Sequence, residues 1–166
     1  MRKKLRRSER SLRMEIDSAL PIEKLYISRS KLNLNFRQFI QEKELENRLQ
    51  ELGWRIFHPQ CHDLLSQIIA YESSSFICAP EGSAIHLLYG TNHLNLKKVI
   101  LLCRNIENNF IKQLLSQDIS HEPIACLEKV EAVREDGQPA PNYDVRLKDG
   151  LSVSDIVENI NNLCQF

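Results

Sequence analysis

Short apolar runs and longer amphipathic stretches alternate along most of the chain. The apolar runs are rich in β-branched and aromatic residues, which is typical of buried strands. We predict strands over residues 24–30, 54–58, 75–79, 98–103 and 124–127. In the stretches between them, apolar side chains recur every three or four residues, as they do on the buried face of a helix. We predict helices over residues 38–52 and 152–163 and shorter helices near residues 64–71, 84–88 and 110–115.

This alternation of strand and helix predicts the fold class. It is typical of an α/β, Rossmann-like domain with three layers, in which a mostly parallel sheet lies between helices. Residues 99–102 are apolar without interruption, as expected for a strand that is buried on both faces of the sheet. We expect residues 21–166 to form this domain. A hairpin or irregular excursion is expected at about residues 129–148, where turn residues such as Gly137 and Pro139 interrupt the pattern.

The start of the chain is a basic arm. Residues 1–13 contain seven Lys or Arg and one Glu, although the whole chain is formally neutral. We expect a basic helix or linker over residues 1–20, ended by Pro21. Such an arm could contact an acidic partner or the anionic face of a membrane, or it could be a solvated surface helix. Nucleic-acid binding is not expected, because the acidic remainder of the chain would repel a phosphate backbone.

The composition of the chain indicates its cellular location and whether it binds a metal or cofactor. No apolar run approaches the roughly 20 residues needed to cross a bilayer, and no apolar stretch follows the basic start, so we expect a cytoplasmic protein. The five cysteines occur singly, without a CxxC pair, which indicates reduced thiols. The group His58, Cys61, His62 and Asp63 lacks the second ligand pair of a zinc site, and the adjacent Cys61 and His62 do not set up a nucleophile and its base. We therefore expect no metal site and no cofactor.

The turn within residues 79–86 is the first candidate site. In an open parallel sheet, ligands bind beyond the carboxyl ends of the strands, where loops lead into helix N-termini. Gly82 would let a ligand approach the backbone closely, and the N–H groups of Ser83 and Ala84 would offer donors to an anion such as a phosphate. The same residues also fit a tight turn in which Ser83 only caps the helix.

Arg29 lies at the end of the first predicted strand and is followed by Ser30 and Lys31, so these side chains leave the sheet at the same edge. A planar guanidinium suits phosphate oxygens, and a salt bridge to a carboxylate is its other common use. Glu81 would repel a phosphate unless it serves another group, such as a sugar hydroxyl. Glu81 and His86 have the chemistry of catalytic candidates, although a histidine on an apolar helix is also a common packing residue.

The order of these motifs resembles glycosyltransferase family 61, the group that includes bacterial capsular polysaccharide biosynthesis proteins. The resemblance covers residues 24–89. It includes the strand LYISRSK with Asn35 and Arg37 after it, the helix rich in Glu and Leu, the segment LGWRIFHPQ, and the strand that ends in the Gly-Ser-Ala turn. Arg29 and the turn at residues 82–84 carry over as the positions that bind the nucleotide sugar. Many relatives have His where this chain has Glu81.

The resemblance implies one lobe of a GT-B enzyme that transfers a glycosyl group, with inversion, from a nucleotide-sugar donor to a glycan acceptor in polysaccharide or glycan biosynthesis. A GT-B enzyme has a second, acceptor-binding lobe. The resemblance therefore implies the donor lobe of a truncated or split enzyme, in which hexosyl or pentosyl transfer needs an acceptor lobe from another polypeptide or from a homo-oligomer. The alternative is a non-catalytic interaction or regulatory domain that retains the fold.

Overall fold

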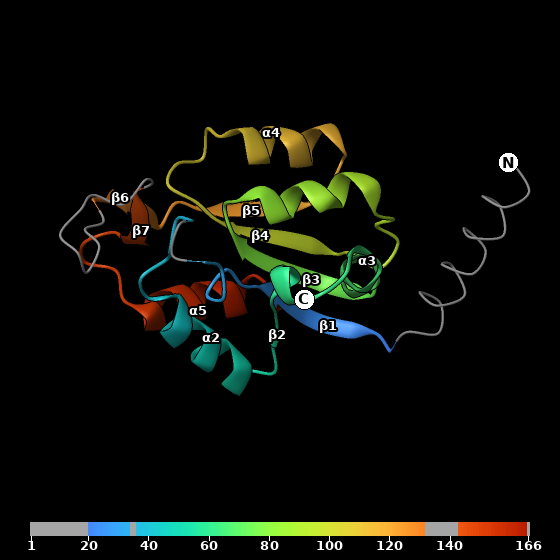
Figure 1. The fold of residues 1–166 in the computed structure, drawn as a ribbon, viewed down its shortest axis with the longest axis horizontal. Helices are drawn as coiled ribbons and strands as arrows, with labels where there is room; N and C mark the ends of the chain where they lie inside the picture. The colour runs from blue at the N-terminus through green and yellow to red at the C-terminus, as the bar shows by residue number, and fades with distance from the viewer. Residues whose placement is uncertain (1–19, 34–35, 132–142, 166) are drawn as a thin grey trace, which may run out of the picture.

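A computed structural model describes residues 20–33, 36–131 and 143–165, and its centre is a five-stranded sheet (Figure 1). The strands are β1 (Ile22–Ile27), β2 (Arg55–Phe57), β3 (Ser74–Pro80), β4 (Lys98–Leu102) and β5 (His121–Ile124). They are ordered β2-β1-β3-β4-β5, and every neighbouring pair is parallel. The predicted α/β fold with a mostly parallel sheet is therefore confirmed.

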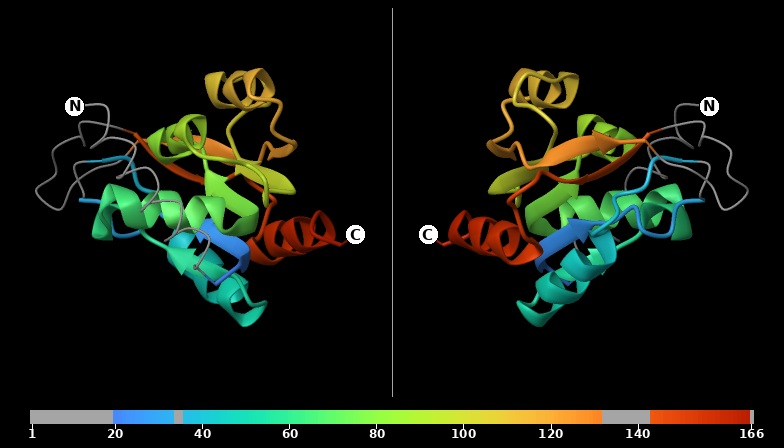
Figure 2. Two further views of the ribbon diagram at one scale, coloured as in Figure 1. Left: turned by 90° about the vertical axis from the view of Figure 1, so that its right-hand side faces the viewer. Right: turned by 90° about the vertical axis from the view of Figure 1, so that its left-hand side faces the viewer.

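Helical elements cover both faces of this sheet (Figure 2). On one face lie α3 (Leu64–Glu72), the 3₁₀ helix η2 (Ser83–Gly90) and α4 (Asn109–Ser116). On the other lie α2 (Glu42–Glu51) and α5 (Val153–Asn162). A short 3₁₀ turn, η1 (Pro59–Cys61), joins β2 to α3. Alternate residues of each strand enter opposite cores: Ile77 packs toward α3, and Cys78 packs toward α2 and α5.

A two-stranded antiparallel sheet stands beyond the carboxyl ends of the parallel strands (Figure 1). It consists of β6 (Leu127–Val130) and β7 (Asp144–Leu147), which border the stretch where a hairpin or irregular excursion was expected. The loop that joins them, residues 132–142, lies outside the described part of the chain. Strand β7 also bridges to Phe39, because the Val145 N–H donates to the Gln38 carbonyl and the Ile40 N–H donates to the Val145 carbonyl. This bridge ties the hairpin to the loop between β1 and α2.

The bounds of several predicted elements need correction. The first strand ends at Ile27, so Ser28, Arg29 and Ser30 lie in the loop after it. The first long helix begins at Glu42 and not at residue 38, because residues 38–40 bond to β7 instead. The strand predicted at residues 124–127 is in fact two strands, β5 and β6, that belong to different sheets.

Two further predictions have different outcomes. The helix expected from residue 84 is a 3₁₀ helix rather than an α-helix. The basic helix expected at residues 1–20 lies, except for Leu20, outside the described residues.

Within the described part of the chain, no helix is long and apolar enough to span a membrane. All five cysteines are free thiols, and Cys78, Cys103 and Cys126 are buried in the strands and loops of the core.

Helix α5 begins with a capping box. The Ser152 hydroxyl accepts from the Asp155 N–H, and the Asp155 carboxylate accepts from the Ser152 N–H at 2.7 Å. Both donors would otherwise lack a partner at the helix start. We expect Ser152→Ala to lower the free energy of unfolding by about 1 kcal/mol in urea denaturation. Ser154→Ala, at an exposed position in the first turn of the same helix, is the control, and equal losses in the two variants would contradict the capping role.

Candidate functional site

The order of the strands reverses at β1, and this reversal defines where a ligand would bind. The chain passes from β1 to β2 on one side and then crosses to β3 on the other. At such a point, the loops after two neighbouring parallel strands diverge to opposite faces and leave a crevice between them. Here the loops begin with Ser28 and Arg29 after β1 and with Glu81 and Gly82 after β3. The two predicted parts of the site therefore meet at one edge of the sheet.

Arg29 crosses this crevice. Its Nη1 donates to the carbonyl of Glu81 at 3.1 Å, and its Nη2 donates to the carbonyl of Arg37 at 3.1 Å. Burial lowers the pKa of its guanidinium from the usual value, an effect that the nearby Glu42 opposes. A Cβ atom at position 82 would lie 2.9 Å from Nη1 of Arg29, which explains why glycine suits this position. Arg29 therefore fixes the loops after β1 and β3 to each other, in addition to placing a positive charge there.

Glu81 is the centre of a charged cluster. Its side chain is 2% exposed, and its Oε1 accepts from Nε of Arg104, the second residue after β4. The main-chain N–H of Arg104 lies 3.4 Å from Oε2, and Nη1 of Arg37 lies 3.9 Å from Oε1. The loops after β1, β3 and β4 thus each bring a charged side chain to one place. We refer to Arg29, Arg37 and Arg104, together with Glu81 and Tyr143, as the arginine cluster.

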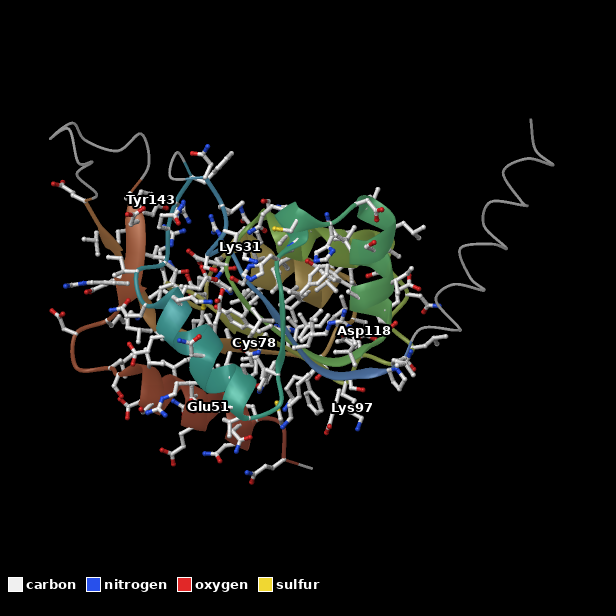
Figure 3. All side chains as sticks on the ribbon, turned by 60° about the horizontal axis from the view of Figure 1, so that its bottom comes forward. Lys31, Glu51, Cys78, Lys97, Asp118 and Tyr143 are labelled. Carbon is white, nitrogen blue, oxygen red and sulfur yellow. The ribbon has the colours of Figure 1, made fainter. Side chains whose placement is uncertain are left out.

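Tyr143, the residue before β7, completes the cluster from the hairpin (Figure 3). Its hydroxyl oxygen accepts from Nη2 of Arg37 and from Nη1 of Arg104, both at 2.6 Å. The guanidinium of Arg37 lies 4.2 Å from the centre of its ring, and the ammonium of Lys129 lies 4.3 Å from it. These contacts hold several cations close together. Among the described residues, the buried Nε of Arg37 has no hydrogen-bond partner. A ligand oxygen placed there could accept from this N–H.

Two buried carboxyl groups support the loop after β1 from below. Glu42 and Glu46, in the first turns of α2, are each 1% exposed. Glu42 accepts from the Arg29 N–H at 2.8 Å and from the Tyr26 hydroxyl at 3.2 Å. Glu46 accepts from the hydroxyls of Ser28 and Ser30. Together they fix the backbone that carries Arg29.

The other residues predicted to bind phosphate make different contacts; they are Ser30, Lys31, Ser83 and Ala84. The first hydrogen bond of η2 runs from the Ile85 N–H to the Gly82 carbonyl, so the N–H groups of Ser83 and Ala84 precede it at the same edge as Arg29. Lys31 is exposed at this edge (Figure 3). The Ser30 hydroxyl is directed to Glu46 and not into the crevice.

The other candidates lie away from the cluster. The His86 ring bonds through Nδ1 to the Gln113 side chain of α4 at 2.6 Å and lies 5.2 Å from the ring of Phe110. It therefore joins η2 to α4 on the face of the sheet that also carries α3. The His62 ring stacks on Phe57 at 4.6 Å, beside the exposed Cys61.

Sequence reasoning missed several residues of the site. Arg104 follows the apolar run of β4 as Arg29 follows β1, and this parallel was a usable signal. Glu42 and Glu46 occupy the same helical face as the buried Leu45 and Leu49, so carboxyl groups at core positions were a second signal. Tyr143 left no signal, because 106 residues separate it from Arg37.

The domain is a doubly wound α/β fold, and the arginine cluster and the glycine turn lie at the reversal of its strand order, where ligands bind in open parallel sheets. The family described as glycosyltransferase 61 matches residues 3–92, which is more than half of the chain. The chain therefore belongs to glycosyltransferase family 61. No curated protein and no solved structure matches it.

The buried Glu42 makes stability depend on pH. Burial raises the pKa of its carboxyl to about 7, whereas an unfolded glutamate titrates near 4.5. Between these values the folded state binds more protons than the unfolded state, so the contribution of Glu42 to stability falls as the pH rises. Glu42→Gln imitates the protonated form and can still accept from Arg29 and Tyr26. We expect its stability relative to the wild type to increase by about 2–3 kcal/mol between pH 4.5 and pH 8, measured by urea denaturation.

The matched control for this prediction is Glu44→Gln, which removes an exposed carboxyl from the same helix. Its stability relative to the wild type should change little over the same pH range. A constant difference between Glu42→Gln and the wild type at every pH would contradict the assignment.

Proposed function

We propose that this domain is the donor lobe of a GT-B glycosyltransferase and that the arginine cluster binds the diphosphate of a nucleotide sugar. Membership of the family supports glycosyl transfer as the reaction class. The observation that carries the assignment of the site is the meeting of Arg29, Arg37 and Arg104 at the carboxyl edge of the sheet. Guanidinium groups bind phosphate oxygens through charge-assisted, often paired hydrogen bonds.

The strand order supports the same place for the donor. The cluster lies where β1 and β3 diverge, and the amides of Ser83 and Ala84 begin η2 beside it. A phosphate there would meet both the guanidinium charge and the N–H groups at the start of a helix. In this proposal Lys31, exposed at the same edge, attracts the donor, and Gly82 keeps the approach to Arg29 free of a side chain.

The proposed reaction is an inverting transfer. An acceptor hydroxyl oxygen attacks the anomeric carbon, the bond from that carbon to the diphosphate oxygen breaks, and the nucleoside diphosphate leaves while a base takes the hydroxyl proton. Cations at the diphosphate stabilise the charge that develops on the leaving group. A second lobe, in this or another polypeptide, would bind the glycan acceptor and orient it, and this positioning supplies much of the rate. We propose that the enzyme acts in the cytoplasm, in polysaccharide or glycan synthesis, as the sequence led us to expect.

The two catalytic candidates take different places in this proposal. Glu81 is 2% exposed, and its carboxylate is engaged by Arg104 and Arg37, so it is not free to accept a proton from an acceptor hydroxyl. We assign it an electrostatic role at the site. His86 is engaged by Gln113, and we assign it to the contact between η2 and α4.

Calorimetry with a panel of nucleotide sugars tests donor binding. We expect at least one of them, and its nucleoside diphosphate, to bind more tightly than about 1 mM, and the bare nucleoside to bind much more weakly. An absence of heat with every nucleoside diphosphate at protein concentrations that detect millimolar binding would refute the proposal. If the protein binds no nucleotide but binds an acidic partner through its first 13 residues, it is an interaction domain instead.

A substitution at Arg37 tests the site itself. Arg37→Gln removes one guanidinium and its charge, and we expect the affinity for the diphosphate ligand to fall by about 10- to 100-fold. The affinity for the bare nucleoside should stay within a factor of about two. Arg48→Gln, which removes an exposed arginine paired with Glu51 on α2, is the control and should change neither affinity. Equal losses for nucleoside and diphosphate would place the phosphates elsewhere.

A further inference from the structure

A buried carboxylate stands in the middle of the site that we assign to an anion. Glu81 directly follows β3, is 2% exposed, and contacts Arg104 through both of its oxygens. Nη1 of Arg37 lies 3.9 Å away on the same side chain. A negative charge at this point lowers the affinity for a diphosphate, so its presence needs a physical explanation.

The other acceptors in the cluster carry no net charge. Arg29 donates to the main-chain carbonyls of Glu81 and Arg37, and Arg37 and Arg104 both donate to the phenol oxygen of Tyr143. Among the described residues, Glu81 is the carboxylate that forms ion pairs with the cluster's guanidinium groups, whereas Glu42 accepts from the main-chain N–H of Arg29. It offsets the repulsion between Arg37 and Arg104, which share one phenol oxygen.

We propose that Glu81 is a built-in counter-anion that sets how strongly the site discriminates between anions of different charge. This inference rests on the proposed function. Glu81 holds Arg37 and Arg104 in place in the free protein, and it repels every bound anion in proportion to the charge of that anion. A nucleotide sugar carries two negative charges on its diphosphate, whereas a nucleoside diphosphate carries about three near neutral pH, since its terminal phosphate has a second pKa of about 6. Glu81 therefore weakens binding of the product more than binding of the donor.

Weaker binding of the product than of the donor would help a transferase to release its product. A site with several guanidinium groups and no counter-anion would hold the nucleoside diphosphate more tightly than the donor, and product release would then limit turnover. With Glu81 present, the loss of the sugar adds a negative charge next to an existing one. The repulsion between them favours exchange of the product for a new donor.

Glu81→Gln tests the inference, because glutamine keeps the size of the side chain and a carbonyl oxygen for Arg104. The ligands are a nucleoside, its nucleotide sugar, its nucleoside diphosphate and inorganic pyrophosphate, titrated at low ionic strength. One unit of site charge should change affinity by about fivefold per unit of ligand charge. We expect no change for the nucleoside, a gain for the nucleotide sugar, and a gain about fivefold larger for the nucleoside diphosphate. All gains should shrink at 0.5 M salt.

Glu51→Gln is the matched control. It removes a carboxylate that also pairs with an arginine, on α2 and away from Tyr143 (Figure 3), and should leave every affinity unchanged. If Glu81→Gln does not fold, as judged by circular dichroism, Glu81→His at pH 8 provides a second side chain that is neutral and forms hydrogen bonds. The same order of gains is expected from it.

The outcomes separate this inference from the proposed function. If the wild type binds nucleotide sugars and the neutral variants show equal gains, no gains or losses for all charged ligands, the counter-anion role is refuted and the donor site stands. If neither the wild type nor the variants bind any nucleotide, the proposed function is refuted. A gain in pyrophosphate affinity by the variants would then show only that Glu81 repels anions at the arginine cluster.

Discussion

The central strands of this domain are covered on both faces, and this constraint determines where its chemistry can lie. In β1, β3 and β4, the buried residues 25–27, 76–80 and 99–102 alternate between two apolar cores, so the carboxyl-terminal parts of these strands have no room for exposed charge. Charged groups can leave the sheet only at the ends of strands. At the carboxyl end, three successive loops do so with Arg29, Glu81 and Arg104. The parallel register brings these ends level with one another, and the cluster follows from that geometry.

The arginine cluster is held from two sides, by carboxyl groups of α2 and by the phenol of Tyr143 in the hairpin, and each of these groups forms hydrogen bonds. From the side of α2, Glu42 and Glu46 accept from the backbone and the hydroxyls of the loop after β1. From the hairpin, Tyr143 accepts from two guanidinium groups, and β7 is bonded to residues 38–40 of the same loop. A site held in this way loses little conformational freedom when a ligand binds, because its side chains are already ordered. The carboxylate of Glu81 has a similar effect on the arginines that it pairs.

The family match and the geometry of the site overlap only in part. The match covers residues 3–92 and so includes Arg29, Arg37 and Glu81. Arg104 and Tyr143 lie beyond residue 92, yet each contacts a residue within the matched segment. The second half of the chain therefore contributes directly to the site and does more than complete the sheet. It supplies one guanidinium and the phenol that joins it to Arg37.

The local pattern of the sequence determined much of this protein by itself. Apolar runs and helical spacing predicted the α/β class, the parallel sheet and the edge at which Arg29 and Gly82 meet, because period and length are properties of neighbouring residues. The split of residues 124–127 between two sheets, the late start of α2 and the position of Tyr143 depended on pairing between segments far apart in the chain. The second role of Arg29, which joins two loops in addition to carrying a charge, also depended on contacts between distant segments. Only the tertiary structure decides such features, because a hydrogen bond across 106 residues leaves no trace in the order of the residues around either partner.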